Sequence, residues 1–238
     1  MGKPLERLPD LSPVPSPSKT AGSTTTTSST NNQEQGKTAV VSEDQQKAQC
    51  LVAIERELGA IAASPSETAV IHRVIAATGD LELGQALQFS SDAVKSGAAA
   101  LAARSPVIVD IPAVQSAIQP TLQACFANRV ICASSTPLEQ LAQRYPNAIY
   151  LVGQRPYILT QLRNLILEKA LYPALVIATP PNWRDDHILV PSLQTLGIPY
   201  LALSGRRGNA IAAIAAIDTI AELTWQVYRH EVNSRTVE

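Results

Sequence analysis

The chain has 238 residues, enough for one sizeable domain built around a single hydrophobic core. Hydrophobic residues make up 45% of the sequence and charged residues 16%, and the formal net charge is -1. The chain therefore lacks the basic field that gathers nucleic acid or anionic membranes. Its three cysteines, Cys50, Cys125 and Cys132, show no metal-ligand spacing. An odd number of cysteines without an export signal predicts reduced thiols in a cytoplasmic protein.

The N-terminal segment, residues 1–42, mixes Pro, Ser, Thr, Asn and Gln with few large apolar side chains. Such a composition predicts a disordered tail, because it cannot offset the entropy lost on ordering. The tail is either a flexible tether or a phosphorylated, partner-binding segment. It lacks the continuous apolar core of a secretory signal. Further along, no apolar run reaches the roughly 20 residues that cross a bilayer without a charge or a proline intruding, so no membrane association is predicted.

A folded domain is predicted over residues 43–232, with a short tail at 233–238. Apolar residues at helical spacing predict a first helix that starts after Ser42. A second helix is predicted to start at Ser64 or Ser66, which are candidate N-caps, and to end at Gly79. The stretch between this helix and residue 90 is interpreted as loop-rich. An alanine-rich third helix, SSDAVKSGAAALAARS, leads directly into a short branched-chain strand, PVIVDI.

Short apolar strands then alternate with helices up to a long C-terminal helix from Asn209 to about Glu231. The strands are predicted at residues 106–111, 129–134, 148–153, 174–179 and 199–205. This alternation predicts an α/β fold, a single doubly wound domain with a mainly parallel sheet covered on both faces. Ligands of such sheets bind beyond the carboxyl ends of the strands, so the loops that follow the five strands are the candidate site.

The loop after the last strand, SGRRGNAIAA, places Gly205, Arg206, Arg207 and Gly208 at the start of the C-terminal helix. Backbone N–H groups and two guanidinium groups there could bind a carboxylate or a phosphate. A polar turn with solvated arginines explains the same residues equally well. No GKS or GKT follows, which excludes a Walker loop.

Two further loops carry polar side chains with open interpretations. Asp110 ends the strand VIVD, where it either belongs to a functional edge or caps the next helix. Trp183 lies in the polar loop TPPNWRDDH, where it either lines a ligand pocket or anchors the loop. The three histidines are far apart in sequence and no GxSxG or HExxH motif occurs, so neither a hydrolase triad nor a catalytic metal is predicted.

Six segments, taken in order, resemble the precorrin-8X methylmutase family of cobalamin biosynthesis over about residues 50–225. They are RVIAATGD, FSSDAVKSGAAAL, PVIVDIPAVQSAI, AIYLVGQRP, ALVIATPP and PYLALSGRRGNA. The resemblance implies a homodimeric α/β protein without a cofactor, which binds a corrin precursor or another tetrapyrrole in a cleft shared between subunits. Enzymes of this family move a methyl group between neighbouring carbons of ring C, with a histidine that protonates the ring.

The resemblance also locates the position of that histidine. Family members read RVIHATGD, so the catalytic histidine falls on Ala76, whose methyl group has no proton to give. A general acid is worth about a hundredfold to ten-thousandfold in rate. His72 lies one helical turn earlier, about 40° round and roughly 6 Å along the axis, and it either substitutes for the missing acid or is an ordinary boundary residue.

Other positions keep or lose the family pattern. Among the substrate-binding candidates, eight are retained, and Gln154, Trp183 and Arg207 lie beside them. The eight are Arg73, Asp80, Ser90, Asp110, Gly153, Gly205, Arg206 and Gly208. By contrast, Arg155, Tyr157 and Ile158 replace small residues and would reshape a cleft. Three hypotheses follow: a weakly active or inactive relative that binds a tetrapyrrole or a protein partner, an active isomerase, and an unrelated enzyme that has reused the pocket.

Overall fold

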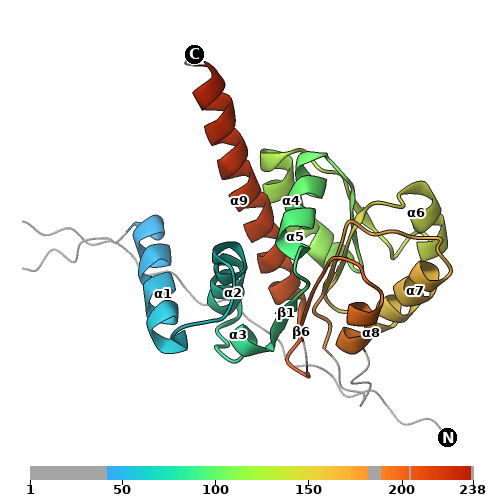
Figure 1. Ribbon diagram of the computed structural model, residues 1–238, viewed down its shortest axis with the longest axis horizontal. Coiled ribbons are helices and arrows are strands. Elements are labelled where there is room, and N and C mark those ends of the chain that lie inside the picture. The colour runs from blue at the N-terminus through green and yellow to red at the C-terminus, as the bar shows by residue number, and fades with distance from the viewer. Residues whose placement is uncertain (1–41, 182–188, 204, 237–238) are drawn as a thin grey trace, which may run out of the picture. The chain divides into compact units, whose positions relative to one another are not determined.

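The computed structural model describes residues 42–181, 189–203 and 205–236 (Figure 1). The predicted tail lies outside these residues, except for Ser42, which caps the first helix. The helices are α1 (Glu43–Leu58), α2 (Pro65–Thr78), α3 (Leu83–Ala86), α4 (Ala93–Ala102), α5 (Pro112–Cys125), α6 (Leu138–Arg144), α7 (Pro156–Leu167), α8 (Leu189–Thr195) and α9 (Ala210–Thr236). The strands are β1 (Leu87–Phe89), β2 (Val107–Val109), β3 (Val130–Cys132), β4 (Ile149–Val152), β5 (Leu175–Ala178) and β6 (Tyr200–Leu203).

These strands form one sheet in the order β1-β6-β5-β4-β2-β3. All neighbouring pairs are parallel except β1 and β6, which run antiparallel at one edge. The prediction of an α/β fold with a mainly parallel sheet is confirmed. The prediction of a loop between α2 and α4 was wrong, because α3 and β1 lie there. Each of these two elements has four residues or fewer, too short to show a periodic pattern.

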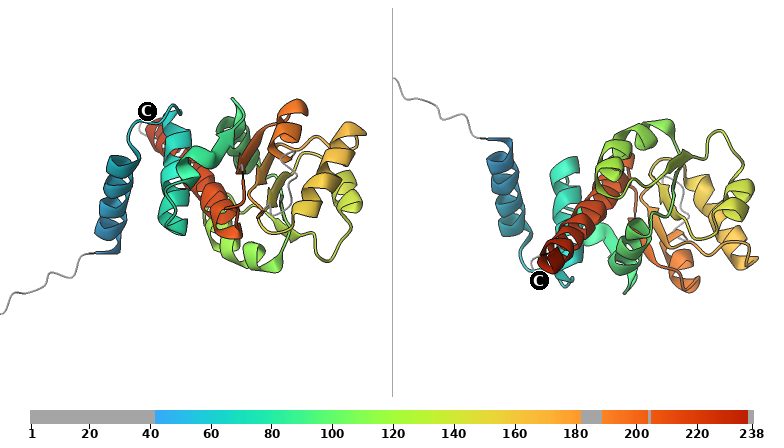
Figure 2. Two further views of the ribbon diagram at one scale, coloured as in Figure 1. Left: turned by 90° about the horizontal axis from the view of Figure 1, so that it is seen from below. Right: turned by 90° about the horizontal axis from the view of Figure 1, so that it is seen from above.

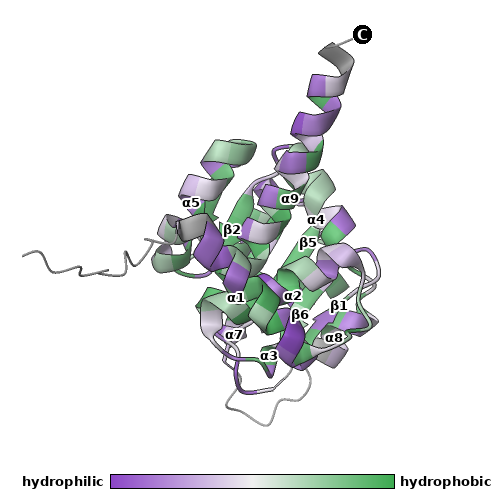
Figure 3. Cartoon of the chain, turned by 90° about the vertical axis from the view of Figure 1, so that its left-hand side faces the viewer, coloured by the Kyte–Doolittle hydropathy of each residue, from purple (hydrophilic) through white to green (hydrophobic). Residues whose placement is uncertain are grey.

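Alternate residues of each strand point to opposite faces of the sheet, and each face is covered by its own helices (Figure 2). Val107 and Val109 face the layer of α2, α4, α5 and α9, whereas Ile108 and Tyr150 face the layer of α6, α7 and α8. The strands β2 and β5 are correspondingly apolar along their length (Figure 3). This double burial explains why the strands read as continuous apolar runs.

The strand order changes direction beside β2. The chain passes from β2 to β3 on one side and then crosses to β4, β5 and β6 on the other. Such a change opens a crevice between the carboxyl ends of the two strands that flank it, here β2 and β4. The loops that follow these two strands begin with Asp110 and Gly153, and they form one part of the candidate site.

The ends of α2 follow from its sequence. The Ser64 side chain accepts a hydrogen bond from the Glu67 backbone N–H, and the Glu67 carboxylate accepts one from the Ser64 N–H, which forms a capping box. Pro65 occupies the first turn, where its missing N–H costs nothing. Gly79 ends the helix in a left-handed conformation, with φ +71°, so that the chain turns sharply toward Asp80.

The C-terminal helix α9 runs through the helical layer on one face of the sheet and ends at Thr236, beyond the predicted Glu231. Neither glycine nor proline follows Glu231 to stop it. Within the described residues, α9 is the one helix whose length and composition would allow it to cross a membrane. Its first half is apolar because Ala212, Ala216 and Ile217 are completely buried in the core, so core packing accounts for that composition.

Candidate functional site

The carboxyl edge of the parallel strands brings together most of the predicted site residues. Asp110 follows β2, Gly153 and Gln154 follow β4, and residues 205–208 follow β6. The end of α2 reaches the last of these loops through Asp80. Trp183, a predicted site residue, lies outside the described residues.

Asp110 holds the two loops of the crevice together. Its side chain is 1% exposed, and its Oδ2 accepts hydrogen bonds from the backbone N–H groups of Gln154 at 2.7 Å and Arg155 at 2.8 Å. These two residues directly precede helix α7, whose dipole also favours a negative charge there. The carboxylate therefore holds the loop after β4 and does not cap its own helix α5, so the N-cap interpretation of this residue was wrong.

Gly153 lets the start of α9 approach the loop after β4. The glycine is buried, and a Cβ placed on it would lie 2.9 Å from the Ala210 Cα, closer than side chains pack. Gly208 is also buried, against the Pro180 carbonyl, with no space for a side chain. Gly153 and Gly208 are thus required by close approaches of the backbone, whereas Gly205, the third glycine of the predicted site, is exposed and adopts a left-handed conformation with φ +89°.

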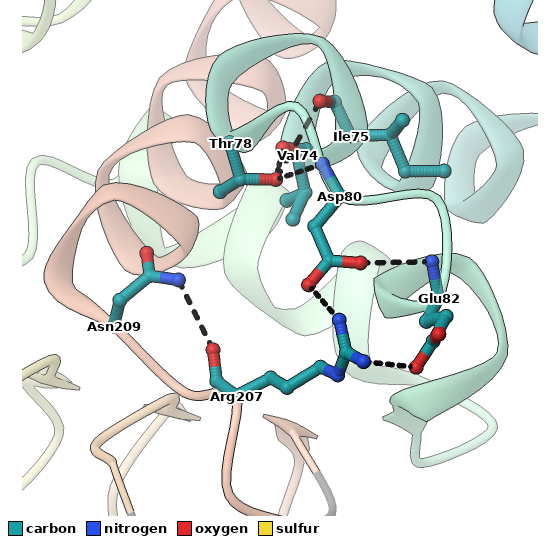
Figure 4. A network of polar contacts seen from close by, with 7 residues as sticks. All are labelled: Val74, Ile75, Thr78, Asp80, Glu82, Arg207 and Asn209. Carbon is teal, nitrogen blue, oxygen red and sulfur yellow. Dashed lines mark hydrogen bonds and ion pairs between the residues drawn. The ribbon is translucent and has the colours of Figure 1, made fainter.

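Arg207 connects the loop after β6 to the end of α2 (Figure 4). Its Nη1 donates to the Asp80 Oδ2 at 2.9 Å, and its Nη2 lies 2.6 Å from the Glu82 Oε2. The hydrogen bond with Arg207 lowers the pKa of Asp80 from its usual value, so this carboxylate is ionised at neutral pH. The guanidinium group is half exposed and already holds two carboxylates of its own chain.

Sequence reasoning missed the residues that support this loop. Asn209 caps α9 by accepting a hydrogen bond from the Ala212 N–H at 2.8 Å, and its Nδ2 donates to the Arg207 carbonyl at 3.1 Å. Thr179, fully buried at the end of β5, donates to the Asn209 carbonyl at 2.9 Å. An Asn directly before an alanine-rich helix is an N-cap signal, and it could have been found from the sequence.

Two other predicted residues lie apart from this edge. Because β1 is antiparallel to β6, Ser90 lies at the opposite edge of the sheet, where its Oγ accepts a hydrogen bond from the Tyr200 N–H at 3.0 Å. Arg73 lies near the middle of α2 and forms an ion pair with Glu222 of α9. The structure therefore separates both residues from Asp110 and from the loop after β6.

Ala76 is exposed on the last turn of α2, four residues before Asp80. His72, one turn earlier, lines a depression of about 240 Å³ together with Arg73, Thr219 and Glu222. The residue four positions before Asp80, the partner of Arg207, therefore has only a methyl group as its side chain. The His72 imidazole lies one turn earlier and borders the depression next to α9.

Comparisons with known proteins identify the family of the chain. Residues 47–223 match the family model described as precorrin-8X methylmutase. The chain belongs to the precorrin-8X methylmutase family. Its members are isomerases of cobalamin biosynthesis, and they act on tetrapyrrole precorrins.

Individual relatives span nearly the same length. A cobalt-precorrin-8 methylmutase from Synechocystis sp. is 25% identical over 200 residues, which cover 73% of this chain and 92% of that protein. A precorrin-8X methylmutase from Pseudomonas aeruginosa is 28% identical, covering 70% of this chain and 88% of that protein. The crystal structure of the Thermus thermophilus precorrin-8X methylmutase matches with a TM-score of 0.70 and 26% identity, covering 75% of this chain and 96% of that one.

Proposed function

We propose that this chain binds a corrin precursor on the methylmutase scaffold but lacks the proton donor of the family's reaction, so that its isomerase activity is weak or absent. The observation that supports the proposal is the exposed alanine Ala76 on the last turn of α2, at the position where the family resemblance implies a histidine. Membership of the family supplies the tetrapyrrole as ligand class.

The carboxyl edge of the sheet supplies groups suited to a polycarboxylate ligand. Arg206 and Arg207 are exposed on the loop after β6, and Arg155 is partly exposed on the loop after β4. Guanidinium groups bind carboxylates through paired N–H donors. These loops are the ones that Asp110, Gly153 and Asn209 hold in place, so the scaffold for binding is built even though the acid is missing.

The reaction itself explains why one missing group matters. A methyl shift within a ring is intramolecular, so positioning and exclusion of water can supply part of the rate without any cofactor. Protonation of the ring by a general acid would add about a hundredfold to ten-thousandfold. His72 cannot supply that proton to the same atom unless the ligand is displaced by about a helical turn.

The alternative is an active isomerase acting on precorrin-8X or on cobalt-precorrin-8. It is favoured by the match to relatives of both names over most of their length. In this alternative, binding energy alone would orient the migrating methyl group, and the rate would be low.

Incubation with precorrin-8X, followed by the absorbance of the corrin product, tests the proposal. We expect little or no turnover by the parent chain and a gain of about a hundredfold or more in Ala76→His. Ala77→His is the matched control, since Ala77 is equally exposed on the same turn, and we expect no gain there. Rapid turnover by the parent would refute the proposal. If none of the three proteins converts precorrin-8X, the defect lies in the binding cleft and not only in the missing acid.

We further infer a cytoplasmic homodimer, as the family resemblance implies. A second copy would cover the apolar groove of about 360 Å³ between α4 and α9, together with the exposed side chains of Val227, Tyr228 and Val232. Exposed apolar surface of this kind favours association between copies. Analytical ultracentrifugation at micromolar concentration measures this directly, and a monomer would contradict the inference.

A further inference from the structure

The Arg207 guanidinium group already pairs with two carboxylates of its own chain. Its two terminal nitrogens each contact a different carboxylate, Asp80 at 2.9 Å and Glu82 at 2.6 Å, both from the turn after α2 (Figure 4). A ligand carboxylate that used this guanidinium would need the same N–H donors. The arrangement therefore places two acids of the chain in the position that an anionic ligand would take.

The two acids are held very differently. Asp80 is fixed by its own turn, because its Oδ1 accepts a hydrogen bond from the Glu82 N–H at 3.1 Å and its N–H donates to the Thr78 hydroxyl. The Glu82 side chain is 71% exposed, and among the described residues its carboxylate contacts only Arg207. The Asp80 carboxylate is thus held by its own turn as well as by Arg207, whereas the Glu82 carboxylate lies on a solvated side chain.

We propose that Glu82 is an internal competitor that covers the ligand-facing donors of Arg207 and gives way to a carboxylate of the bound tetrapyrrole, while Asp80 keeps the guanidinium aimed. The proposal rests on the proposed function, since it concerns the same loop and the same ligand class. It adds the regulation of that site: Glu82 lowers the affinity for polycarboxylates and sets a selectivity for ligands that carry enough of them.

The exchange costs little because the bridge is exposed. Ion pairs between solvated side chains contribute little net free energy and are screened by salt. A tetrapyrrole that contacts several loops at once presents its carboxylate at high effective concentration, which favours replacement of the exposed Glu82. The backbone of Arg207 stays in place during the exchange, because the Asn209 side chain holds its carbonyl.

Titration with uroporphyrin, a tetrapyrrole rich in carboxylates, followed by its absorbance and fluorescence, tests this exchange. We expect Glu82→Gln to bind about threefold to fivefold more tightly than the parent, the gain that release of one exposed ion pair allows. Arg207→Ala should bind about tenfold more weakly, since a charged hydrogen-bond donor is lost.

Two further proteins separate the local competition from a general change in charge. Adding Glu82→Gln to Arg207→Ala should give no further gain, because the donors that Glu82 covers are gone. Glu57→Gln removes a carboxylate from a comparable exposed ion pair, with Arg56 on α1, and should leave binding unchanged. Circular dichroism of each variant verifies that the fold is retained.

The outcomes distinguish this inference from the proposed function. Binding by the parent with no gain in Glu82→Gln, or with the same gain when Arg207 is absent, overturns the competition and leaves tetrapyrrole binding intact. Binding by Glu82→Gln alone supports the competition in its strongest form. Binding by none of the proteins overturns both the competition and the proposed binding function.

Discussion

Two regions of the same sheet edge use an aspartate to join loops that are distant in sequence, and they differ in burial. Asp110 is 1% exposed and accepts two backbone N–H groups of the loop after β4. The Asp80 side chain is 27% exposed and pairs with Arg207 of the loop after β6. The chemistry of the acceptor is the same, but the buried contact fixes architecture, whereas the more exposed one holds Arg207, whose second contact, with Glu82, is the one proposed to exchange.

The difference follows from the cost of removing each contact. A buried carboxylate that loses its donors keeps its desolvation penalty, since no water replaces them. An exposed carboxylate that loses its partner is solvated at once, and salt already weakens the pairing. A binding site built on this edge therefore has one rigid wall at Asp110 and one adjustable wall at Arg207.

The largest effect is expected for Asp110→Ala. The buried carboxylate and both of its short hydrogen bonds to the residues before α7 are lost, so the free energy of unfolding should fall by about 2–4 kcal/mol. Urea denaturation followed by circular dichroism measures this change. Asp110→Asn, which keeps an acceptor oxygen, should lose less. A loss as small as that in Asp80→Ala would show that burial does not distinguish the two walls.

The parallel sheet was predictable because its local signals agree. Each central strand is a continuous apolar run, as expected for burial on both faces, and α2 carries its own start and stop signals in Ser64 and Gly79. The edge strand β1 carries no such signal, since it has three residues, of which only Leu87 is buried. Missing that strand also hid the position of Ser90, because only the antiparallel pairing takes it to the other edge.

The contacts of the site were not predictable from the sequence. Asp110 and its two donors are 44 and 45 residues apart, and Asp80 and Arg207 are 127 residues apart. Both pairings depend on the order of the strands, which local patterns do not determine. The sequence identified Asp110 and the arginine pair as polar groups at the correct edge, but the partner of each emerges only from the fold.

The next largest effect is expected for a third carboxylate, that of Asp218 on α9, which is partly buried. Burial raises its pKa from 3.8 to about 6, with a further contribution from Glu222, while the Thr121 hydroxyl and Arg73 oppose the rise. A raised carboxylate pKa means that the folded state binds the proton more tightly, so stability falls as the pH rises from about 4 to about 6. Above about pH 6, the full destabilisation caused by the partly buried Asp218 charge remains.

Asp218→Asn should remove this pH dependence. With allowance for the solvent that still reaches the side chain, we expect a gain of about 1 kcal/mol in the free energy of unfolding at pH 7 and no gain near pH 4. Denaturation curves across that pH range measure both values. Asp92→Asn, on an exposed carboxylate at the start of α4, is the matched control and should follow the parent. An unchanged slope in Asp218→Asn would assign the pH dependence to other groups.

The smallest effect is expected at the adjustable wall. Asp80→Asn keeps an oxygen for the Glu82 N–H but loses the charge that faces Arg207, so the melting temperature should change less than in either variant above. The change should appear only at low salt and vanish at about 1 M salt, where exposed charges are screened within a few ångströms. Melting curves of parent and variant at the two salt concentrations provide the measurement. A difference that persists at high salt would mean that the Asp80–Arg207 contact is structural, and the contrast with Asp110 would then disappear.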